Sequence, residues 1–303
     1  MSLTKAVGID LGGTSVKGVL IDSDGEILKE LHRETDFNIE SLDNPLHWAN
    51  VVKQVREELT DGQDLTTGIS APGLAANDER SIAIMPGRFP GLEGFAWPEF
   101  LDTNKVCVLN DAKSALVAEA TLGAGKGHKD MILLTLGTGV GGAIMIDGKL
   151  YKGTLDRAGH LGHISLDIDG PVGITNIPGS LETAIGNATV SERTSGAFDT
   201  TFDLIKAVED GDTNARECWL LSVRKLAAGL CSLINVLSPE LVILGGGISR
   251  AGDILMDNLD QYMEKYEWRP DGNRTPIRIA KYLEMSGALG AACYAINRTN
   301  ESL

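Results

Sequence analysis

Residues 9–14 read IDLGGT and residues 136–142 read LGTGVGG. Each stretch lies between two short apolar runs rich in β-branched residues, a pattern typical of β-strands. Glycine at such a turn lets the backbone bend tightly and lets another group approach it closely. We therefore predict two strand–turn–strand hairpins with glycine-rich tips.

The two hairpins share an order of features: strand, glycine turn, strand, turn containing an aspartate, and a further strand. The equivalent positions are Leu11 and Leu136, Gly12 and Gly137, Val19 and Ile144, and Asp22 and Asp147. Chance similarity between two glycine hairpins is the alternative, but the shared order favours an internal duplication.

The second glycine turn also fits the dinucleotide pattern G-x-G-x-x-G, which requires a helix directly after the glycines. Residues 143–148 read AIMIDG, which predicts a strand and a tight turn, so the dinucleotide interpretation fails. The phosphate loop G-x-x-x-x-G-K-[ST] does not occur in the sequence either. A hairpin tip with exposed backbone N–H groups remains, and such a tip can hold a phosphate.

Several neighbouring residues strengthen the phosphate hypothesis. Thr14 and Thr138 add hydroxyl donors to the two turns, and a third glycine run at residues 245–247 follows an apolar strand. Asp10 ends the first strand beside its turn, where a bare carboxylate would repel phosphate. Its expected role is to hold Mg²⁺ directly or through water, and capping of the turn is the alternative.

The rest of the chain alternates strands with helices, which predicts an α/β fold. Its 303 residues are enough for two domains. Residues 75–99, rich in proline and glycine, are predicted to form a long loop. The apolar spacing predicts helices at residues 48–59, 112–122, 219–237 and 288–296.

The formal charge of −15 argues against a nucleic-acid or membrane partner, because no basic surplus exists to neutralise phosphates. A small phosphorylated ligand is still compatible with this charge. Four cysteines lack any Cys-x-x-Cys pair, so we expect free thiols in a reducing compartment. Since no signal segment is recognised, we expect a cytoplasmic protein.

Four segments in this order carry a family resemblance: IDLGGT at residues 9–14, Asn110-Asp111-Ala112, LGTGVGG at residues 136–142, and LGGG at residues 244–247. Together they resemble the ROK family of sugar kinases, repressors and open-reading-frame proteins, across essentially the whole chain. The resemblance implies the two-domain actin/hexokinase-like ATPase fold, ribonuclease H-like, with a duplicated hairpin core.

The resemblance also implies a domain division. A small N-terminal α/β domain would span residues 1–113, and a larger C-terminal α/β domain residues 114–286. A C-terminal helix, residues 287–303, would return to the first domain. A homodimer is implied as well.

The family's catalytic base corresponds to Asp111. A sugar hydroxyl barely ionises at neutral pH, so a nearby carboxylate can take its proton as the oxygen attacks the γ-phosphate of ATP. Capping of the following helix is the alternative for the Asn110-Asp111 pair. The expected sugar-binding residues are Gly73, Asn110, Asp111, His160, His163 and Glu182. The expected nucleotide-binding residues are Gly12, Gly13, Thr14, Lys17, Gly137, Thr138, Gly139, Gly245 and Gly246.

The sequence departs from the family pattern near the sugar. Residues 160–163 read HLGH, so His160 stands where family kinases have glutamate, and Arg88 stands where many members have asparagine. These changes predict a substrate other than plain glucose, because buried polar groups discriminate strongly between hydroxyl patterns. Residues 173–180, GITNIPGS, lack the family's zinc-binding cysteines, so no structural zinc is expected.

These observations predict a glucokinase-like ATP:hexose phosphotransferase that uses ATP and Mg²⁺. One alternative is a kinase for an N-acylated amino sugar or another hexose, or one that uses polyphosphate. A catalytically silent sugar or nucleotide sensor is another. A DNA-binding repressor is disfavoured, because only nine residues precede Asp10 and the chain is acidic.

Overall fold

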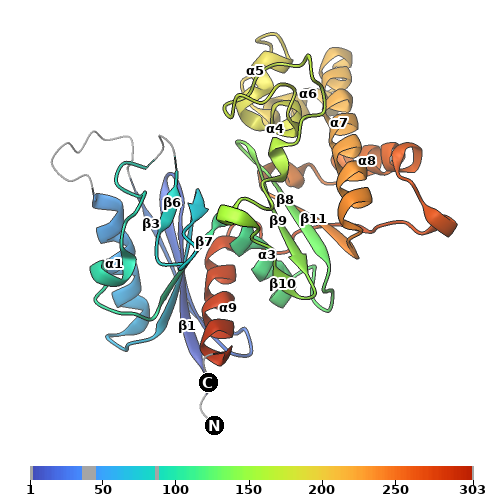
Figure 1. Ribbon diagram of the computed structural model, residues 1–303. Coiled ribbons are helices and arrows are strands. Elements are labelled where there is room, and N and C mark those ends of the chain that lie inside the picture. Colours follow the sequence, from blue (N-terminus) through green and yellow to red (C-terminus); the bar gives the residue numbers. More distant parts are fainter. Residues whose placement is uncertain (1–2, 36–45, 86–88, 302–303) are drawn as a thin grey trace. The chain divides into compact units, whose positions relative to one another are not determined.

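The computed structural model describes residues 3–35, 46–85 and 89–301 (Figure 1). The chain divides into two compact units. The first contains Met1–Gly127, Leu150–Ala158 and Glu284–Leu303, and the second contains His128–Lys149 and Gly159–Leu283. The first unit thus extends beyond the boundary predicted at residue 113 and takes in a short internal segment as well as the C-terminal helix.

The first unit is built on a five-stranded sheet with the order β3-β2-β1-β4-β7. Its first three strands form an antiparallel meander, and β4 and β7 then add in parallel to β1. The strands are β1 (Lys5–Leu11), β2 (Ser15–Asp22), β3 (Ile27–Glu34), β4 (Thr66–Ala71) and β7 (Val106–Asn110).

Two helices cover opposite faces of this sheet, α1 (His47–Thr60) and α9 (Ser286–Glu301) (Figure 1). Gly8 lets α9 approach, since a Cβ there would lie 1.9 Å from the carbonyl oxygen of Ala288. Gly18, on the other face, would meet Val55 of α1. The helix α3 (Asp111–Leu122) packs against α9.

The predicted long loop at residues 75–99 contains regular structure, so this prediction was wrong. The described part holds β5 (Leu74–Ala75), β6 (Ile82–Ile84) and α2 (Trp97–Phe100). Ile82, Leu92 and Trp97 are fully buried here. These separated anchors attach the segment to the core without producing a helical or strand period in the sequence.

The second unit repeats the topology, with the sheet order β10-β9-β8-β11-β12. Again a hairpin, β8–β9, is followed by two strands added in parallel. The strands are β8 (Met131–Leu136), β9 (Val140–Ile146), β10 (Lys149–Leu150), β11 (Leu241–Gly245) and β12 (Ile277–Ile279). This equivalence confirms the predicted duplicated hairpin core and the α/β class.

The helices of the second unit enclose its main hydrophobic core. The α-helices are α4 (Leu181–Ile185), α5 (Val190–Arg193), α6 (Thr201–Glu209), α7 (Thr213–Leu237) and α8 (Asp253–Tyr266). Short 3₁₀ helices are η1 (Thr154–Asp156, in the first unit), η2 (Leu161–His163), η3 (Asn187–Thr189), η4 (Gly247–Ala251) and η5 (Pro270–Gly272).

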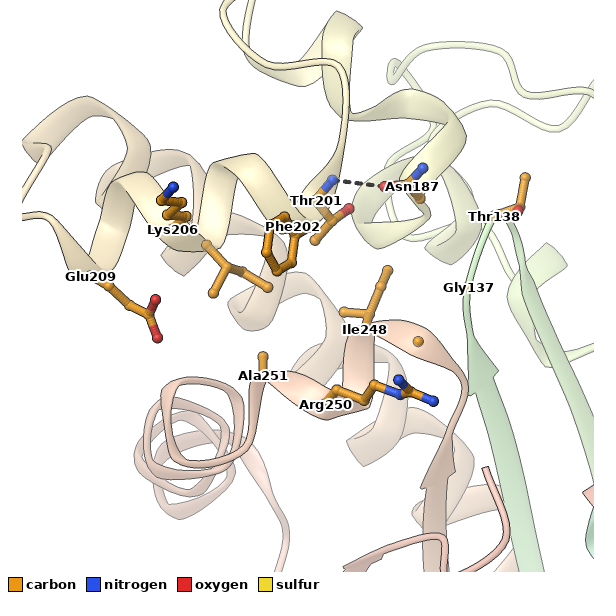
Figure 2. Close-up of a pocket in the computed structure, with 12 residues that line it drawn as sticks. Gly137, Thr138, Asn187, Thr201, Phe202, Lys206, Glu209, Ile248, Arg250 and Ala251 are labelled. Carbon is orange, nitrogen blue, oxygen red and sulfur yellow. Dashed lines mark hydrogen bonds between the residues drawn. The ribbon is translucent and has the colours of Figure 1, made fainter. Parts of the chain in front are cut away.

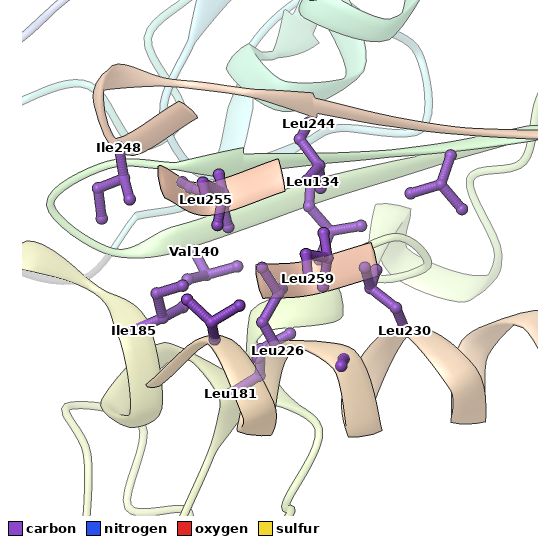
Figure 3. Close-up of a cluster of buried hydrophobic side chains, with 14 of the residues drawn as sticks. Leu134, Val140, Leu181, Ile185, Leu226, Leu230, Leu244, Ile248, Leu255 and Leu259 are labelled. Carbon is purple, nitrogen blue, oxygen red and sulfur yellow. The ribbon is translucent and has the colours of Figure 1, made fainter. Parts of the chain in front are cut away.

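The longest of these helices, α7, begins at Thr213, earlier than predicted, because the side chain of Asp212 caps it by accepting from the backbone N–H of Ala215. By length and composition alone α7 could cross a membrane. Its apolar face is instead packed in the core, where Leu226 and Leu230 belong to one buried cluster with side chains of the sheet and of α8 (Figure 3). A buried core helix passes the same test, so α7 is weak evidence for a membrane span.

Candidate active site

The carboxyl ends of three parallel strands bring polar residues to one edge of the first unit's sheet. Asp10 on β1 is the register partner of Ser70 on β4, and Ala71 of β4 is the partner of Asn110 on β7. Asp111 follows directly as the first residue of α3. In open α/β sheets this edge is where ligands bind.

Asp10 is a poorly solvated carboxylate. Its Oδ1 accepts a 2.6 Å hydrogen bond from the hydroxyl of Ser70. Gly287 in the first turn of α9 abuts it so closely that a Cβ there would lie 2.3 Å from Oδ1. Burial raises the pKa of Asp10 to about 6, against the hydrogen bond from Ser70; Asp111 raises it further and Lys17 lowers it. A desolvated carboxylate beside a second one favours a bound cation.

The first glycine turn presents its tip to solvent. Gly13 and Thr14 are exposed, and the backbone N–H of Gly12 closes the turn on the carbonyl of Ser15 at 3.0 Å. Nothing lies within 4 Å of a Cβ built on Gly13. Lys17 is the register partner of Asp10 across the hairpin, and its Nζ donates to the carbonyl of Glu284 at 3.0 Å. The tip therefore offers open space to a ligand beside both a cation and a carboxylate.

Asn110 is the residue of the Asn110-Asp111 pair whose side chain caps the following helix. The Oδ1 of Asn110 caps α3 by accepting from the backbone N–H groups of Ala112 and Lys113, at 3.0 and 3.3 Å. Its Nδ2 donates to the carbonyl of Gly73 at 2.9 Å. The side chain of Asp111 is exposed, and its Oδ1 accepts from Ala112 at 2.8 Å. Asn110 is thus the cap, and the carboxylate of Asp111 faces solvent at the helix N-terminus.

The second glycine turn is held by hydrogen bonds from residues 187–188, which the sequence did not indicate. The backbone N–H groups of Asn187 and Ala188 donate to the carbonyls of Gly137 and Thr138, both at 2.9 Å. The turn's carbonyls are therefore engaged on the protein side, and Thr138 is exposed at the tip.

Glu182 supports the same turn. Its Oε2 accepts the backbone N–H of Val140 at 2.9 Å. A Cβ on Gly139 would lie 2.3 Å from this oxygen, so a larger residue there would displace the carboxylate. The residue expected to contact sugar therefore supports the second glycine turn.

The third glycine run lies beside the second hairpin. Gly245 ends β11 opposite Thr135 of β8. Gly246 has a φ of +83°, and a Cβ there would lie 2.4 Å from the carbonyl oxygen of Leu136. Gly247 then begins η4. Both the left-handed backbone and the close approach require glycine at position 246.

Within the second unit a pocket of about 880 Å³ extends from these turns. One wall is α6, with Phe202 exposed by 74% and Lys206, and the opposite wall is η4, with Ile248 and Arg250 (Figure 2). The side chain of Asn187 accepts a 2.7 Å hydrogen bond from the backbone N–H of Thr201, the first residue of α6. The lining residues are Gly137, Thr138, Asn187, Thr201, Phe202, Ile205, Lys206, Glu209, Gly247, Ile248, Arg250 and Ala251.

Two of the predicted sugar-binding residues form a stacked pair in the second unit. The rings of His160 and His163 lie 6.0 Å apart between centroids and are tilted by 4°. His160 precedes η2 and His163 is its last residue, and the carbonyl of the following Ile164 accepts from the backbone N–H of Leu181 at 2.9 Å. The pair is thereby fixed next to the segment that carries Glu182.

Two predictions about this region stay untested. Across residues 3–35, 46–85 and 89–301, no group of three or more His, Cys, Asp or Glu side chains could hold a metal ion. The expectation of no structural zinc remains a prediction. Arg88 lies outside the described residues, so its effect on specificity also stays a prediction.

This chain is similar to known proteins along most of its length. The profile of the ROK family matches residues 6–298. A glucokinase of Thermotoga maritima is 31% identical, covering 96% of this chain and 97% of the relative. An N-acetylmannosamine kinase of Vibrio cholerae is 27% identical, with coverage of 95% and 98%.

Solved structures of ROK proteins are similar to this chain over nearly its whole length. The ROK hexokinase of Thermus thermophilus superposes with a TM-score of 0.82 at 26% identity, covering 98% of this chain and 100% of that one. A ROK family glucokinase of Streptomyces griseus, in complex with glucose and AMPPNP, has a TM-score of 0.76 at 26% identity, with coverage of 98% and 100%. The predicted resemblance and fold class are confirmed: this chain belongs to the ROK family and has the actin-like ATPase fold.

Proposed function

We propose that this protein is a sugar kinase that transfers the γ-phosphoryl group of ATP to a hydroxyl of a hexose-type sugar. One observation carries the proposal: the exposed carboxylate of Asp111 stands at the N-terminus of α3, on the same strand-end edge as the half-buried carboxylate of Asp10. The glucokinase and N-acetylmannosamine kinase names of its relatives support the same activity.

Asp111 is proposed to act as the general base. Its carboxylate takes the proton of the acceptor hydroxyl while that oxygen forms a bond to the γ-phosphorus. The bond from phosphorus to the β–γ bridging oxygen breaks, and ADP leaves with the electron pair. Because this transition state is loose, the remaining task of the protein is to position reactants and neutralise charge. Asn110 and Gly73, joined by their hydrogen bond, would position the sugar beside Asp111.

Asp10 fits a Mg²⁺ site that completes its shell with water and phosphate oxygens, as this ion commonly does. The support is the desolvation of its carboxylate and the neighbouring Asp111, which together raise the pKa of Asp10. When bound, Mg²⁺ would neutralise charge on the phosphates. Ser70 would orient the carboxylate through its hydrogen bond to Oδ1.

The glycine turns are proposed to hold the phosphates of ATP. Gly12, Gly13 and Thr14 would act in the first unit with Lys17, and Gly137, Thr138 and Gly139 in the second unit with Gly245 and Gly246. The pocket between α6 and η4 has a volume suited to a nucleoside. Phe202 offers an aromatic face on which the base could stack.

The acceptor sugar is proposed to contact His160, His163 and Glu182. His160 exchanges the expected glutamate, an acceptor only, for an imidazole that can also donate. A hydroxyl pattern different from that of glucose follows, so another hexose or an N-acylated amino sugar is the proposed acceptor. Homodimerisation is proposed on the family resemblance alone, and light scattering of the purified chain would test it. A cytoplasmic location stays an expectation from the sequence.

The activity is tested by coupling ADP release to a panel of hexoses, amino sugars and N-acylated amino sugars. We expect at least one sugar to raise ADP release well above the sugar-free rate, and Asp111→Asn to abolish the increase while ATP still binds. Asp24→Asn, an exposed carboxylate of the same unit, is the matched control and should keep full turnover. Thermal stabilisation by a sugar without turnover would indicate the sensor instead, and wild-type turnover by Asp111→Asn would remove the base assignment.

A further inference from the structure

Lys113 and Asp156 form a buried ion pair that the proposed mechanism does not use. Lys113, the third residue of α3, is fully buried, and Asp156 in η1 is 4% exposed. The Nζ of Lys113 donates to Oδ1 of Asp156 at 2.5 Å and to its carbonyl oxygen at 2.6 Å. Both residues belong to the first unit.

A buried pair of this kind is a poor device for stability. Removing two charges from water costs more than most single contacts return, and well-packed apolar residues of similar size are often at least as stabilising. Burial lowers the pKa of Lys113, and the hydrogen bond and charge of Asp156 oppose that shift. We therefore expect the pair to matter for the position of the segments that it connects.

The pair closes a ring of hydrogen bonds around the start of α3. Oδ2 of Asp156 accepts the backbone N–H of Ala75 at 3.0 Å. Two residues earlier, the carbonyl of Gly73 accepts from Asn110 at 2.9 Å, and Oδ1 of Asn110 accepts from the backbone of Lys113 at 3.3 Å. The ring thus ties residues 73–75 to the helix turn that begins with Asp111.

The backbone of Asp156 shows that this position is maintained against strain. Leu155 and Asp156 have φ values of +58° and +57°, in the left-handed region that residues with a Cβ seldom occupy. Such conformations persist only where the surroundings enforce them, and they concentrate at functional sites. Here three hydrogen bonds to Asp156, from Lys113 twice and from Ala75, enforce it.

We propose that Lys113 and Asp156 are a positioning pair that sets the first turn of α3 against residues 73–75, and thereby fixes the carboxylate of Asp111 relative to the acceptor sugar. The pair touches no substrate and acts through Asn110, Gly73 and the helix backbone. This inference rests on the proposed kinase function. Since the hydrogen bonds of the pair lead to Gly73 and Asn110, which are proposed to position the sugar, its loss affects the sugar step and leaves nucleotide binding intact.

The test is the double variant Lys113→Met/Asp156→Asn. It removes both charges together, so no unpaired charge stays buried, and the new asparagine can still accept from Ala75. At a temperature well below its unfolding midpoint, we expect a folded enzyme with kcat/KM for the sugar reduced about 10- to 100-fold, the scale of a small misplacement of a catalytic group. The Kd for AMPPNP should stay within about twofold of wild type.

A matched control separates positioning from general destabilisation. Arg56 of α1 is a partly buried cation of the same unit. Its Nε donates to Thr67 at 3.0 Å, near the start of β4 and away from the strand end that leads to Gly73. Arg56→Met should lower the unfolding temperature without changing kcat/KM for the sugar. If the folded double variant kept wild-type kcat/KM, or lost sugar and nucleotide affinity equally, the positioning inference would be wrong.

The proposed function is checked in the same assay by Asp111→Asn. Loss of turnover by Asp111→Asn with full turnover by the double variant would overturn the positioning inference alone. Wild-type turnover by Asp111→Asn would overturn the base assignment, and with it the inference.

Discussion

Ser70 donates a 2.6 Å hydrogen bond to Asp10 across the parallel register that joins β1 to β4. Because Gly287 of α9 closes over the same carboxylate, water reaches it poorly, and the pKa of Asp10 rises from 3.8 to about 6. A carboxylate kept this close to neutrality is costly to ionise in the free protein. Its retention at a strand end beside Asp111 is best explained by a cation that it holds during function.

Asp10→Asn should stabilise the protein at high pH. Since the folded pKa lies above the unfolded value, the stability that this group contributes is complete below pH 3.8 and is lost as the pH rises through about 6. Removing the ionisable group should therefore raise the free energy of unfolding at pH 8 by about 3 kcal/mol, and the gain should shrink toward pH 4. Denaturant titrations at both pH values measure this, and the variant should also lose kinase turnover.

Asp24→Asn is the control for that measurement, because Asp24 is exposed on the same unit. A gain for Asp10→Asn that did not change between the two pH values would contradict the raised pKa.

Gly246→Ala should destabilise the second unit. The φ of +83° disfavours any side chain, and the Cβ would lie 2.4 Å from the carbonyl oxygen of Leu136. We expect a loss of about 2 kcal/mol or more in the free energy of unfolding. Gly247→Ala is the matched control, since nothing lies within 4 Å of its Cβ, and it should change stability by less than about 1 kcal/mol. Equal losses for the two variants would contradict the close approach at Gly246.

Phe202→Ala should weaken the binding of ATP without weakening the binding of the sugar. Phe202 lines the pocket and is 74% exposed, so its loss leaves no cavity in the core. Loss of a stacked aromatic contact of about 1 kcal/mol predicts a roughly fivefold rise in KM for ATP. Steady-state kinetics with each substrate varied in turn measure it. The control is Leu221→Ala, because Leu221 is an exposed apolar residue of α7 outside the pocket. An unchanged KM for ATP in Phe202→Ala would show that the adenine base of ATP does not stack on Phe202.

The sequence predicted those parts of the site that are local in the chain. The glycine turns, Asp10 at a strand end and the Asn110-Asp111 pair each leave a pattern of a few consecutive residues, and the duplicated order of strands is visible in the same way. Phe202, the Lys113–Asp156 pair and the support of Gly137 by Asn187 left no such pattern. Each depends on contacts between residues tens of positions apart, and only packing decides those.

The role of Glu182 shows the same limit and yields a prediction. The family resemblance indicates a sugar contact, whereas in the structure Oε2 accepts from Val140 directly beneath Gly139. The two roles are compatible, because a carboxylate has two oxygens with about four acceptor sites. If Glu182 performs both, its two substitutions should separate them.

Glu182→Gln retains an acceptor for Val140 and should leave KM for ATP near wild type while raising KM for the sugar. Glu182→Ala removes the acceptor, leaves a buried N–H unsatisfied and loosens the turn at Gly139, so KM for ATP should rise about tenfold as well, as the loss of 1–3 kcal/mol implies. Comparing the two KM values in both variants is the measurement. An unchanged KM for ATP in folded Glu182→Ala would show that Asn187 and Ala188 suffice to hold the turn, and that Glu182 acts on the sugar alone.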